Sequence, residues 1–107
     1  MTGMEGVQVL SISLGYVMGQ ALHAAAKLRI PDAMASGPST VEDIAERTRT
    51  HVPSLRRVLR TLASGGIVTE DENGSYALTS LGHTLRADAE GSVRDAVIWV
   101  SEAMHYR

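Results

Sequence analysis

The middle of the chain carries apolar residues at helical spacing in two successive runs. The first run follows Ser39 and Glu42, a pair suited to a capping box at the start of a helix. Its apolar face consists of Val41, Ile44 and Ala45. We therefore expect a short helix that begins directly after Ser39 and turns this face toward a core.

The second run predicts a longer helix that starts at Pro53. Proline suits a first helical turn, because its missing N–H would have no partner there. The apolar stripe recurs at i, i+3, i+4 and i+7 and consists of Leu55, Val58, Leu59 and Leu62. Gly65 and Gly66 should end the helix, because glycine adopts the left-handed conformation without steric cost.

After the two glycines the pattern changes to that of β-strands. Residues 67–69 and 76–78 favour strands, and Asn73-Gly74 lies between them. Asn-Gly favours a tight hairpin turn, because both residues accept a positive φ. Two helices followed by a β-hairpin predict a winged helix over residues 39–82. The fold class is thus mainly α with a small β-hairpin.

The start of the chain predicts a long helix over residues 5–28. Residues 6–26 contain no Asp, Glu, Lys or Arg, and apolar side chains occupy nearly every face. Such a helix must be covered nearly all round, which a small domain cannot easily do. Gly15 and Gly19, four residues apart, leave a flat surface for another backbone. We expect this helix to pair with its copy in a homodimer. The alternative is a central helix in a monomeric core.

The same stretch is long enough to cross a bilayer. Polar residues are scattered through it, including Gln8, Gln20 and His23, and each would be costly in hydrocarbon. We therefore expect no membrane span.

Two short helices should flank the winged helix. One spans Pro31 to Ala35, and the other is capped by Thr79 and holds Leu81 and Leu85. Ser92 and Asp95 form a second capping pair, which predicts a last helix over residues 92–107. This helix carries two apolar stripes, and its helical pattern continues to the last residue of the sequence. We expect residues 1–107 to be one domain of a longer protein.

Composition narrows the classes of function. The net charge of -2 gives no general attraction to nucleic acid or to anionic membranes. The chain has no cysteine, so disulfides, thiolate nucleophiles and cysteine-ligated zinc are excluded. This composition and the lack of a secretory signal pattern suit a cytoplasmic protein.

The chain resembles the N-terminal dimerisation domain of S-adenosylmethionine-dependent small-molecule O-methyltransferases of bacterial antibiotic pathways and plant secondary metabolism. The stretches that carry the likeness are AAKLRIPD at 25–32, VEDIA at 41–45, LRRVLRTLASGGI at 55–67 and YALTSLG at 76–82. The sequence departs from the family pattern at Val52, where Asp or Asn often caps the helix.

This resemblance implies a homodimer and a following Rossmann-like domain that binds S-adenosylmethionine and supplies the catalytic histidine. That domain is absent from these residues, since no Gly-rich turn follows a strand. We therefore expect no catalytic residue and no bound cofactor in this chain, whose parent would methylate a small aromatic or polyketide-like acceptor. Whether the chain itself counts as an enzyme stays open.

Single residues suggest candidate substrate contacts but no metal site. The family likeness suggests that the last helix roofs the acceptor pocket, which makes Trp99 and Met104 candidate substrate contacts and Tyr16 and Tyr106 weaker ones. Packing against a partner explains the same residues equally well. No histidine pair has the spacing of a helical metal site, so no metal is expected.

A winged helix can also bind DNA through its second helix. Arg56, Arg57 and Arg60 on that helix favour this alternative. The acidic run Glu70-Asp71-Glu72 at the wing opposes it, because a DNA-binding wing lies against phosphates. We therefore expect no nucleic-acid partner. A free-standing protein-interaction module is the third alternative.

Overall fold

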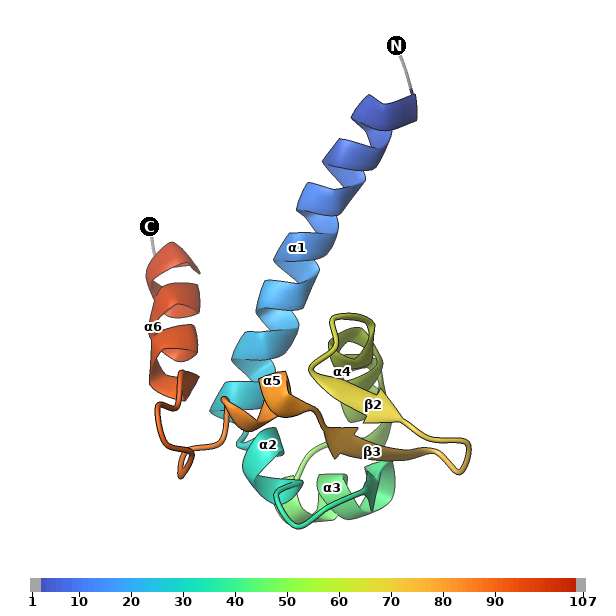
Figure 1. The fold of residues 1–107 in the computed structure, drawn as a ribbon, viewed down its shortest axis with the longest axis vertical. Coiled ribbons are helices and arrows are strands. Elements are labelled where there is room, and N and C mark those ends of the chain that lie inside the picture. The colour runs from blue at the N-terminus through green and yellow to red at the C-terminus, as the bar shows by residue number, and fades with distance from the viewer. Residues whose placement is uncertain (1–2, 106–107) are drawn as a thin grey trace.

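The computed structural model describes residues 3–105 and is mainly helical, with three short strands in one antiparallel sheet (Figure 1). The predicted fold class is confirmed: a long N-terminal helix leads into a winged helix, and a last helix follows. The sheet has one more strand than the hairpin that the sequence predicts.

Helix α1 spans Gly3–Lys27, close to the predicted 5–28. Only its last third enters the core, where Ala21, Ala25 and Ala26 are buried. Arg29 then adopts a left-handed conformation, with φ of 59°, and turns the chain into α2 (Ile30–Ala33). This short helix was predicted over Pro31 to Ala35, so it begins one residue earlier and ends two residues earlier.

Helix α3 (Val41–Thr48) begins with Thr40 and not with the predicted capping box of Ser39 and Glu42. The Thr40 hydroxyl accepts a hydrogen bond from the amide of Asp43 at 3.1 Å, so it performs the capping that we assigned to Ser39. Ser39 instead belongs to strand β1 (Ser39–Thr40), which the sequence analysis missed. A strand of two residues is too short to show a period.

Helix α4 (Val52–Ser64) begins one residue before the predicted Pro53. Its apolar stripe is confirmed, because Leu55, Leu59 and Leu62 are buried and Val58 is half-buried. The side chain of the preceding His51 makes no capping bond, which matches the missing Asp or Asn at this turn. The helix ends at Ser64, Gly65 is its C-cap, and Gly66 follows with φ of 77°.

The wing consists of β2 (Val68–Glu70) and β3 (Ser75–Leu78), with β3 in the centre of the order β1-β3-β2. Its turn differs from the predicted Asn-Gly hairpin, because Gly74 has a positive φ and Asn73 does not. Asp71 organises the loop by accepting hydrogen bonds from the amides of Asn73 and Ser75, both at 2.9 Å.

The hydrophobic core lies where the end of α1 meets α2, α3, α4 and the sheet. Tyr76 on the central strand fills its largest space. Residues from each of these elements are buried around it, namely Ala25, Ile30, Met34, Ile44, Leu59, Leu62 and Val68. The core is therefore built from residues 21–78, and the first part of α1 takes no part in it.

Thr79 caps α5 (Ser80–His83), as predicted, by accepting from the amide of Gly82 at 3.2 Å. Leu81 lies in α5 but is exposed, and the buried Leu85 lies beyond it. The following link is held to α2, where Asp32 Oδ1 accepts from the amide of Ala87 at 2.8 Å.

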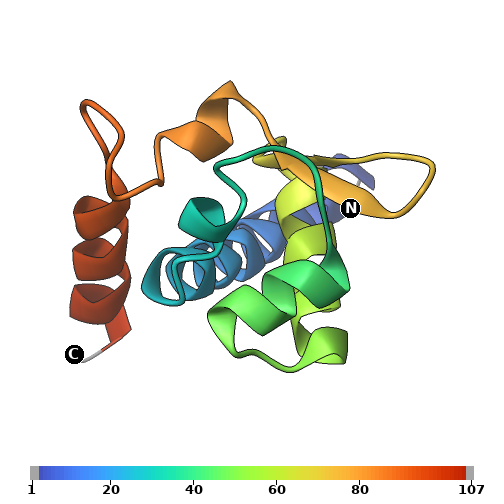
Figure 2. The same ribbon diagram turned by 90° about the horizontal axis from the view of Figure 1, so that it is seen from below.

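Helix α6 (Arg94–His105) begins two residues after the predicted Ser92. The Ser92 hydroxyl accepts from the amide of Arg94 at 3.2 Å, while Asp95 pairs with the Arg94 guanidinium, so the predicted capping box does not form. Figure 2 shows α6 beside α1 and apart from α3 and α4. The helix thus lies outside the winged-helix core.

Candidate functional site

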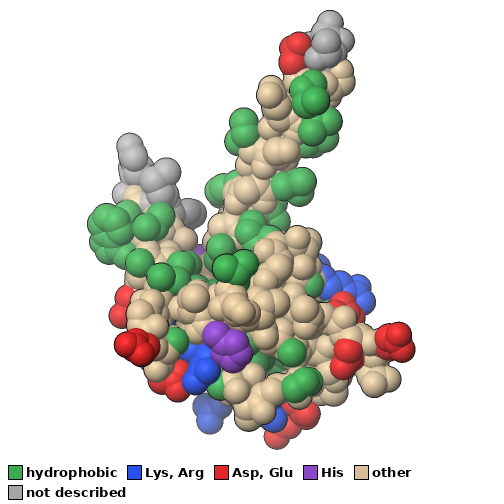
Figure 3. Space-filling model, viewed as in Figure 1, with side chains coloured by type: hydrophobic (Ala, Val, Ile, Leu, Met, Phe, Trp, Pro, Cys, Tyr) green, Lys and Arg blue, Asp and Glu red, His purple; other side chains and the backbone are tan. Residues whose placement is uncertain are grey.

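The first part of α1, residues 4–17, extends away from the rest of the chain, and we call it the α1 arm (Figure 1). Its large apolar side chains are 46–76% exposed, and Figure 3 shows hydrophobic side chains along both edges of the helix in this view. They are Met4, Val7, Val9, Leu10, Ile12, Leu14, Tyr16 and Val17. The alternative of a central helix in a monomeric core is therefore wrong for this part of α1.

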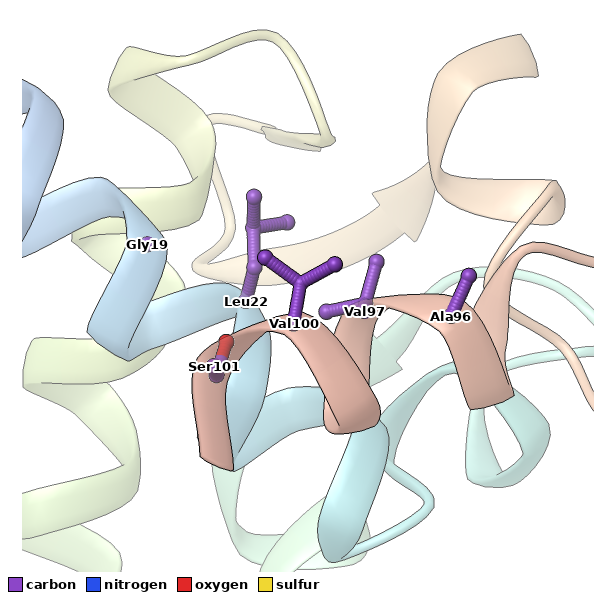
Figure 4. A pocket seen from close by; sticks show the side chains of 6 residues that line it. All are labelled: Gly19, Leu22, Ala96, Val97, Val100 and Ser101. Atoms are coloured by element: carbon purple, nitrogen blue, oxygen red, sulfur yellow. The ribbon is translucent and has the colours of Figure 1, made fainter. Parts of the chain in front are cut away.

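Beside the base of the arm, α1 and α6 enclose a groove of about 290 Å³. Gly19 and Leu22 form one wall, and Val97 and Val100 form the other, with Ala96 and Ser101 completing the lining (Figure 4). Five of these six residues are apolar, and Gly19 has no heavy atom within 4 Å of the position of an added Cβ. The groove thus suits an apolar occupant and leaves the α1 backbone open to close approach.

The last helix carries two predicted apolar stripes, one with Val93, Val97, Val100 and Met104 and the other with Ala96, Trp99 and Ala103. Residues of both stripes, including Ala96, line the groove. Val97 and Val100, from one stripe, line the groove. Trp99, from the other stripe, is 71% exposed and takes no part in the groove lining. Trp99 was predicted as a substrate contact on the family likeness, and Val97 and Val100 were not. Helical spacing separates the two stripes but does not tell which residues face α1.

The remaining predicted contact residues are spread out. Tyr16 lies on the α1 arm, is 64% exposed, and its hydroxyl accepts a hydrogen bond from Gln20 at 3.0 Å. Met104 lies within α6, but its side chain is outside the part that the structure describes, and Tyr106 lies wholly outside it. The predicted set therefore does not form one described cluster.

A small charged cluster joins α6 to α1, and we call it the clamp. It consists of Glu102 on α6 with His23 and Lys27 on α1. Glu102 Oε2 lies 2.6 Å from Lys27 Nζ and 3.1 Å from His23 Nε2. The Lys27 ammonium, followed by the hydrogen bond to His23, lowers the pKa of the Glu102 carboxyl below its ordinary value.

The other two histidines whose side chains the structure describes make isolated contacts. His51 Nδ1 lies 2.9 Å from the Ser54 hydroxyl, and His83 Nδ1 lies 3.2 Å from Arg86. Within residues 3–105 no three His, Asp or Glu side chains are grouped to hold a metal ion. The described residues thus provide no basis for a metal centre.

On the second helix of the winged helix, Arg57 and Arg60 are exposed, whereas Arg56 has an acidic partner. Arg56 pairs with Glu42 at 3.3 Å, while the exposed wing carries Glu70, Asp71 and Glu72. Below the wing, burial raises the pKa of the Tyr76 phenol, the Glu70 carboxylate adds to this shift, and Arg60 opposes it. This arrangement of charges gives the DNA-binding alternative no support.

By length and composition α1 could also cross a membrane. This is weak evidence, because a single long apolar helix that packs against another protein has the same properties. The helix end at residues 21–26 is built into the core, and the arm carries Gln8, Ser11 and Ser13 among its apolar residues.

Comparison with known proteins identifies the family. The model of the O-methyltransferase dimerisation domain matches residues 10–88. The phenazine O-methyltransferase PhzM of Lysobacter antibioticus is 39% identical over 97 residues, which are 91% of this chain and 28% of that protein. The 2,7-dihydroxy-5-methyl-1-naphthoate 7-O-methyltransferase of Streptomyces carzinostaticus is 43% identical over 68 residues, 64% of this chain and 20% of that protein.

A solved structure agrees over the same region. CalO1, a methyltransferase in calicheamicin biosynthesis solved in its SAH-bound form, superposes with a TM-score of 0.86 at 34% identity, covering 99% of this chain and 32% of that one. The chain thus spans about a third or less of the relatives that it matches. On the family match, the fold and these relatives, the chain belongs to the O-methyltransferase dimerisation domain family.

Proposed function

We propose that this chain dimerises through the α1 arm and thereby assembles an S-adenosylmethionine-dependent O-methyltransferase that acts on a small aromatic or polyketide-like metabolite. The exposed arm is the observation that carries the proposal. Residues 4–17 carry eight exposed large apolar side chains. A soluble monomer rarely leaves a continuous apolar surface of this kind uncovered. A second copy offers a surface of the same composition.

Two-fold symmetry explains why one helix can serve both sides of such an interface. In a two-fold dimer the same patch occurs on both subunits, so the arm of each copy can lie against the other. Gly15 and Gly19 have no heavy atom within 4 Å of an added Cβ, so a second backbone can come close at both positions. The interface core would be apolar, as in obligate dimers.

The groove between α1 and α6 supports a second part of the proposal, that this chain supplies one wall of the acceptor site. Its volume of about 290 Å³ is near the lower end for small-molecule pockets, which are mostly apolar with few polar groups. Ser101 is the polar side chain of its lining. The names of the relatives, which include phenazine and naphthoate methyltransferases, support a flat aromatic acceptor.

The cofactor and the methyl transfer are assigned to the rest of the parent enzyme. A nucleotide-type cofactor is normally bound by a Gly-rich turn after a parallel strand. In the part of the chain that the structure describes, the Gly65-Gly66 pair ends helix α4, and the sheet is antiparallel. These residues therefore do not fit S-adenosylmethionine, and we derive no catalytic step from them.

Sedimentation equilibrium tests the dimer. At micromolar concentration we expect twice the 11.4 kDa of one chain. Ile12→Asp should shift the chain to monomer, because it places a charge on a side chain that is 76% exposed in one copy and would be buried between two. Thr69→Asp adds the same charge on the exposed wing and should leave the dimer intact. A wild-type chain that stays monomeric over this range would contradict the proposal.

A further inference from the structure

Helix α6 packs along α1 but adds no fully buried side chain to the described part of the molecule. Every residue from 94 to 103 keeps some exposure to solvent, so none of them belongs to the core. The link before α6 is polar, and its two ends are joined by a hydrogen bond from the amide of Val93 to the carbonyl of Thr84 at 2.9 Å. Half-buried side chains such as Val97 and Ile98 and the polar contacts with α1 together hold α6 in place.

These contacts lie at two places along α6. At its start, Arg94 Nε donates to the carbonyl oxygen of Ala26 at 2.9 Å, and the Arg94 side chain is largely buried. Two turns later, Glu102 reaches both Lys27 and His23 of the clamp. The first contact fixes the beginning of the helix. The second is the polar contact that holds the far part of the helix to α1.

We propose that α6 is a hinged arm that pivots at Arg94 and is held closed against α1 by the clamp of Glu102, Lys27 and His23. Arg94 and Asp95 on α6 and His23 and Lys27 on α1 are the described charged groups near this contact, and only Glu102 links the two helices through a carboxylate. When Glu102 loses its charge, α6 loses its second attachment while the hinge at Arg94 stays in place.

Opening would change the groove directly. Val97 and Val100 lie between the hinge and the clamp and form the α6 wall, while Gly19 and Leu22 stay with α1. Movement of α6 about Arg94 would therefore widen the groove without altering the winged helix. This device is a property of the single chain and does not depend on the proposed dimer or acceptor.

Hydrogen exchange measured by mass spectrometry on the 107-residue chain tests the hinge. Glu102→Gln keeps the size of the side chain and removes its charge. We expect the α6 amides to exchange roughly two- to five-fold faster, the range for a partly exposed ion pair. The α4 amides should be unchanged. Glu90→Gln is the matched control, because Glu90 is exposed in the link and has no described partner.

Equal α6 exchange in the wild type and Glu102→Gln would overturn the proposal, as would an equal acceleration by Glu90→Gln. If Glu102→Gln also accelerates exchange of the α4 amides, the wild type is measured again with added salt, because salt screens exposed charges. Selective acceleration in α6 supports the clamp, and its absence refutes it. Sedimentation of the same samples shows separately whether the chain is dimeric, so failure of the dimer and failure of the hinge can be told apart.

Discussion

Residues 21–26 of α1 and the α1 arm at residues 4–17 belong to one continuous and largely apolar helix, yet their surroundings are opposite. Ala21, Ala25 and Ala26 are buried against the winged helix, whereas Leu10 and Ile12 are more than 60% exposed. The small residues face a core that the chain itself completes. The large residues face a surface that the chain does not cover.

This difference shows what an apolar pattern can and cannot tell. Hydrophobic free energy depends on the area removed from water, and any covering surface serves. The pattern of α1 therefore predicts burial, but it does not say whether the cover is the same chain or another one. At residues 21–26 the covering surface is the same chain. At the arm we propose that it is a second copy.

The largest expected effect comes from a pair of leucine truncations. Leu59→Ala in the buried face of α4 should lower the free energy of unfolding by about 2–5 kcal/mol, because it leaves a cavity in a closed core. Leu10→Ala on the arm should change the stability of dilute monomer by less than about 0.5 kcal/mol. Urea denaturation at several protein concentrations measures both.

The pair also sharpens the comparison through its concentration dependence. The loss at Leu59 should be constant, whereas the loss at Leu10 should grow as dimer forms. Equal losses at the lowest concentration would mean that the arm is already covered within one chain.

Two glycines give the next effect in size. Gly82 is buried, and an added Cβ would collide with the backbone carbonyl of Ile67, so Gly82→Ala should cost about 1–3 kcal/mol. Gly15 on the arm has open space around it, and Gly15→Ala should stabilise the monomer helix by up to about 1 kcal/mol. Thermal unfolding of both variants in dilute solution checks the signs. If Gly15→Ala destabilises the chain at concentrations where it is monomeric, another part of the same chain must pack against the arm at this position.

The smallest effect concerns the contact between α1 and α6. The pKa of Glu102 is lowered in the folded chain, so its charged form adds stability above the ordinary carboxyl pKa. This contribution should be lost as the pH falls from about 4.5 through the lowered pKa. Exchange of the α6 amides should therefore accelerate in acid, after correction for intrinsic rates, in the wild type and not in Glu102→Gln. An identical acid response in both would assign the effect to another group.

Much of the winged helix was predictable from the sequence, because its elements carry strong periodic patterns. The Leu55, Leu59 and Leu62 stripe and the glycines after it placed α4 to within one residue. Thr79 was recognised as a cap because a helical run follows it directly. At Ser39 and Thr40 two adjacent hydroxyl residues competed for the same cap, and strand β1 took Ser39.

The groove was harder to predict because it depends on how two distant helices lie together. The spacing of residues on α6 separated Val97 and Val100 from Trp99, but it could not say which stripe faces α1. The clamp joins residues 75 and 79 positions apart in the sequence, so no local pattern connects them. The Asn73-Gly74 turn differed because Asp71 supplies the side-chain bonds that shape a longer loop.

The most direct test of the α1 arm as the dimer surface uses one spin label per chain. The sequence has no cysteine, so Ser13→Cys on the arm and Ser36→Cys in the loop after α2 each give a single labelling site, and both serines are exposed. With one label per chain, a dipolar distance arises only between two copies. If the arm is the dimer surface, the two labels at position 13 should lie at a short, defined distance from each other, and the two labels at position 36 should lie much farther apart. Absence of any dipolar coupling at position 13, or a shorter distance at position 36, would contradict it.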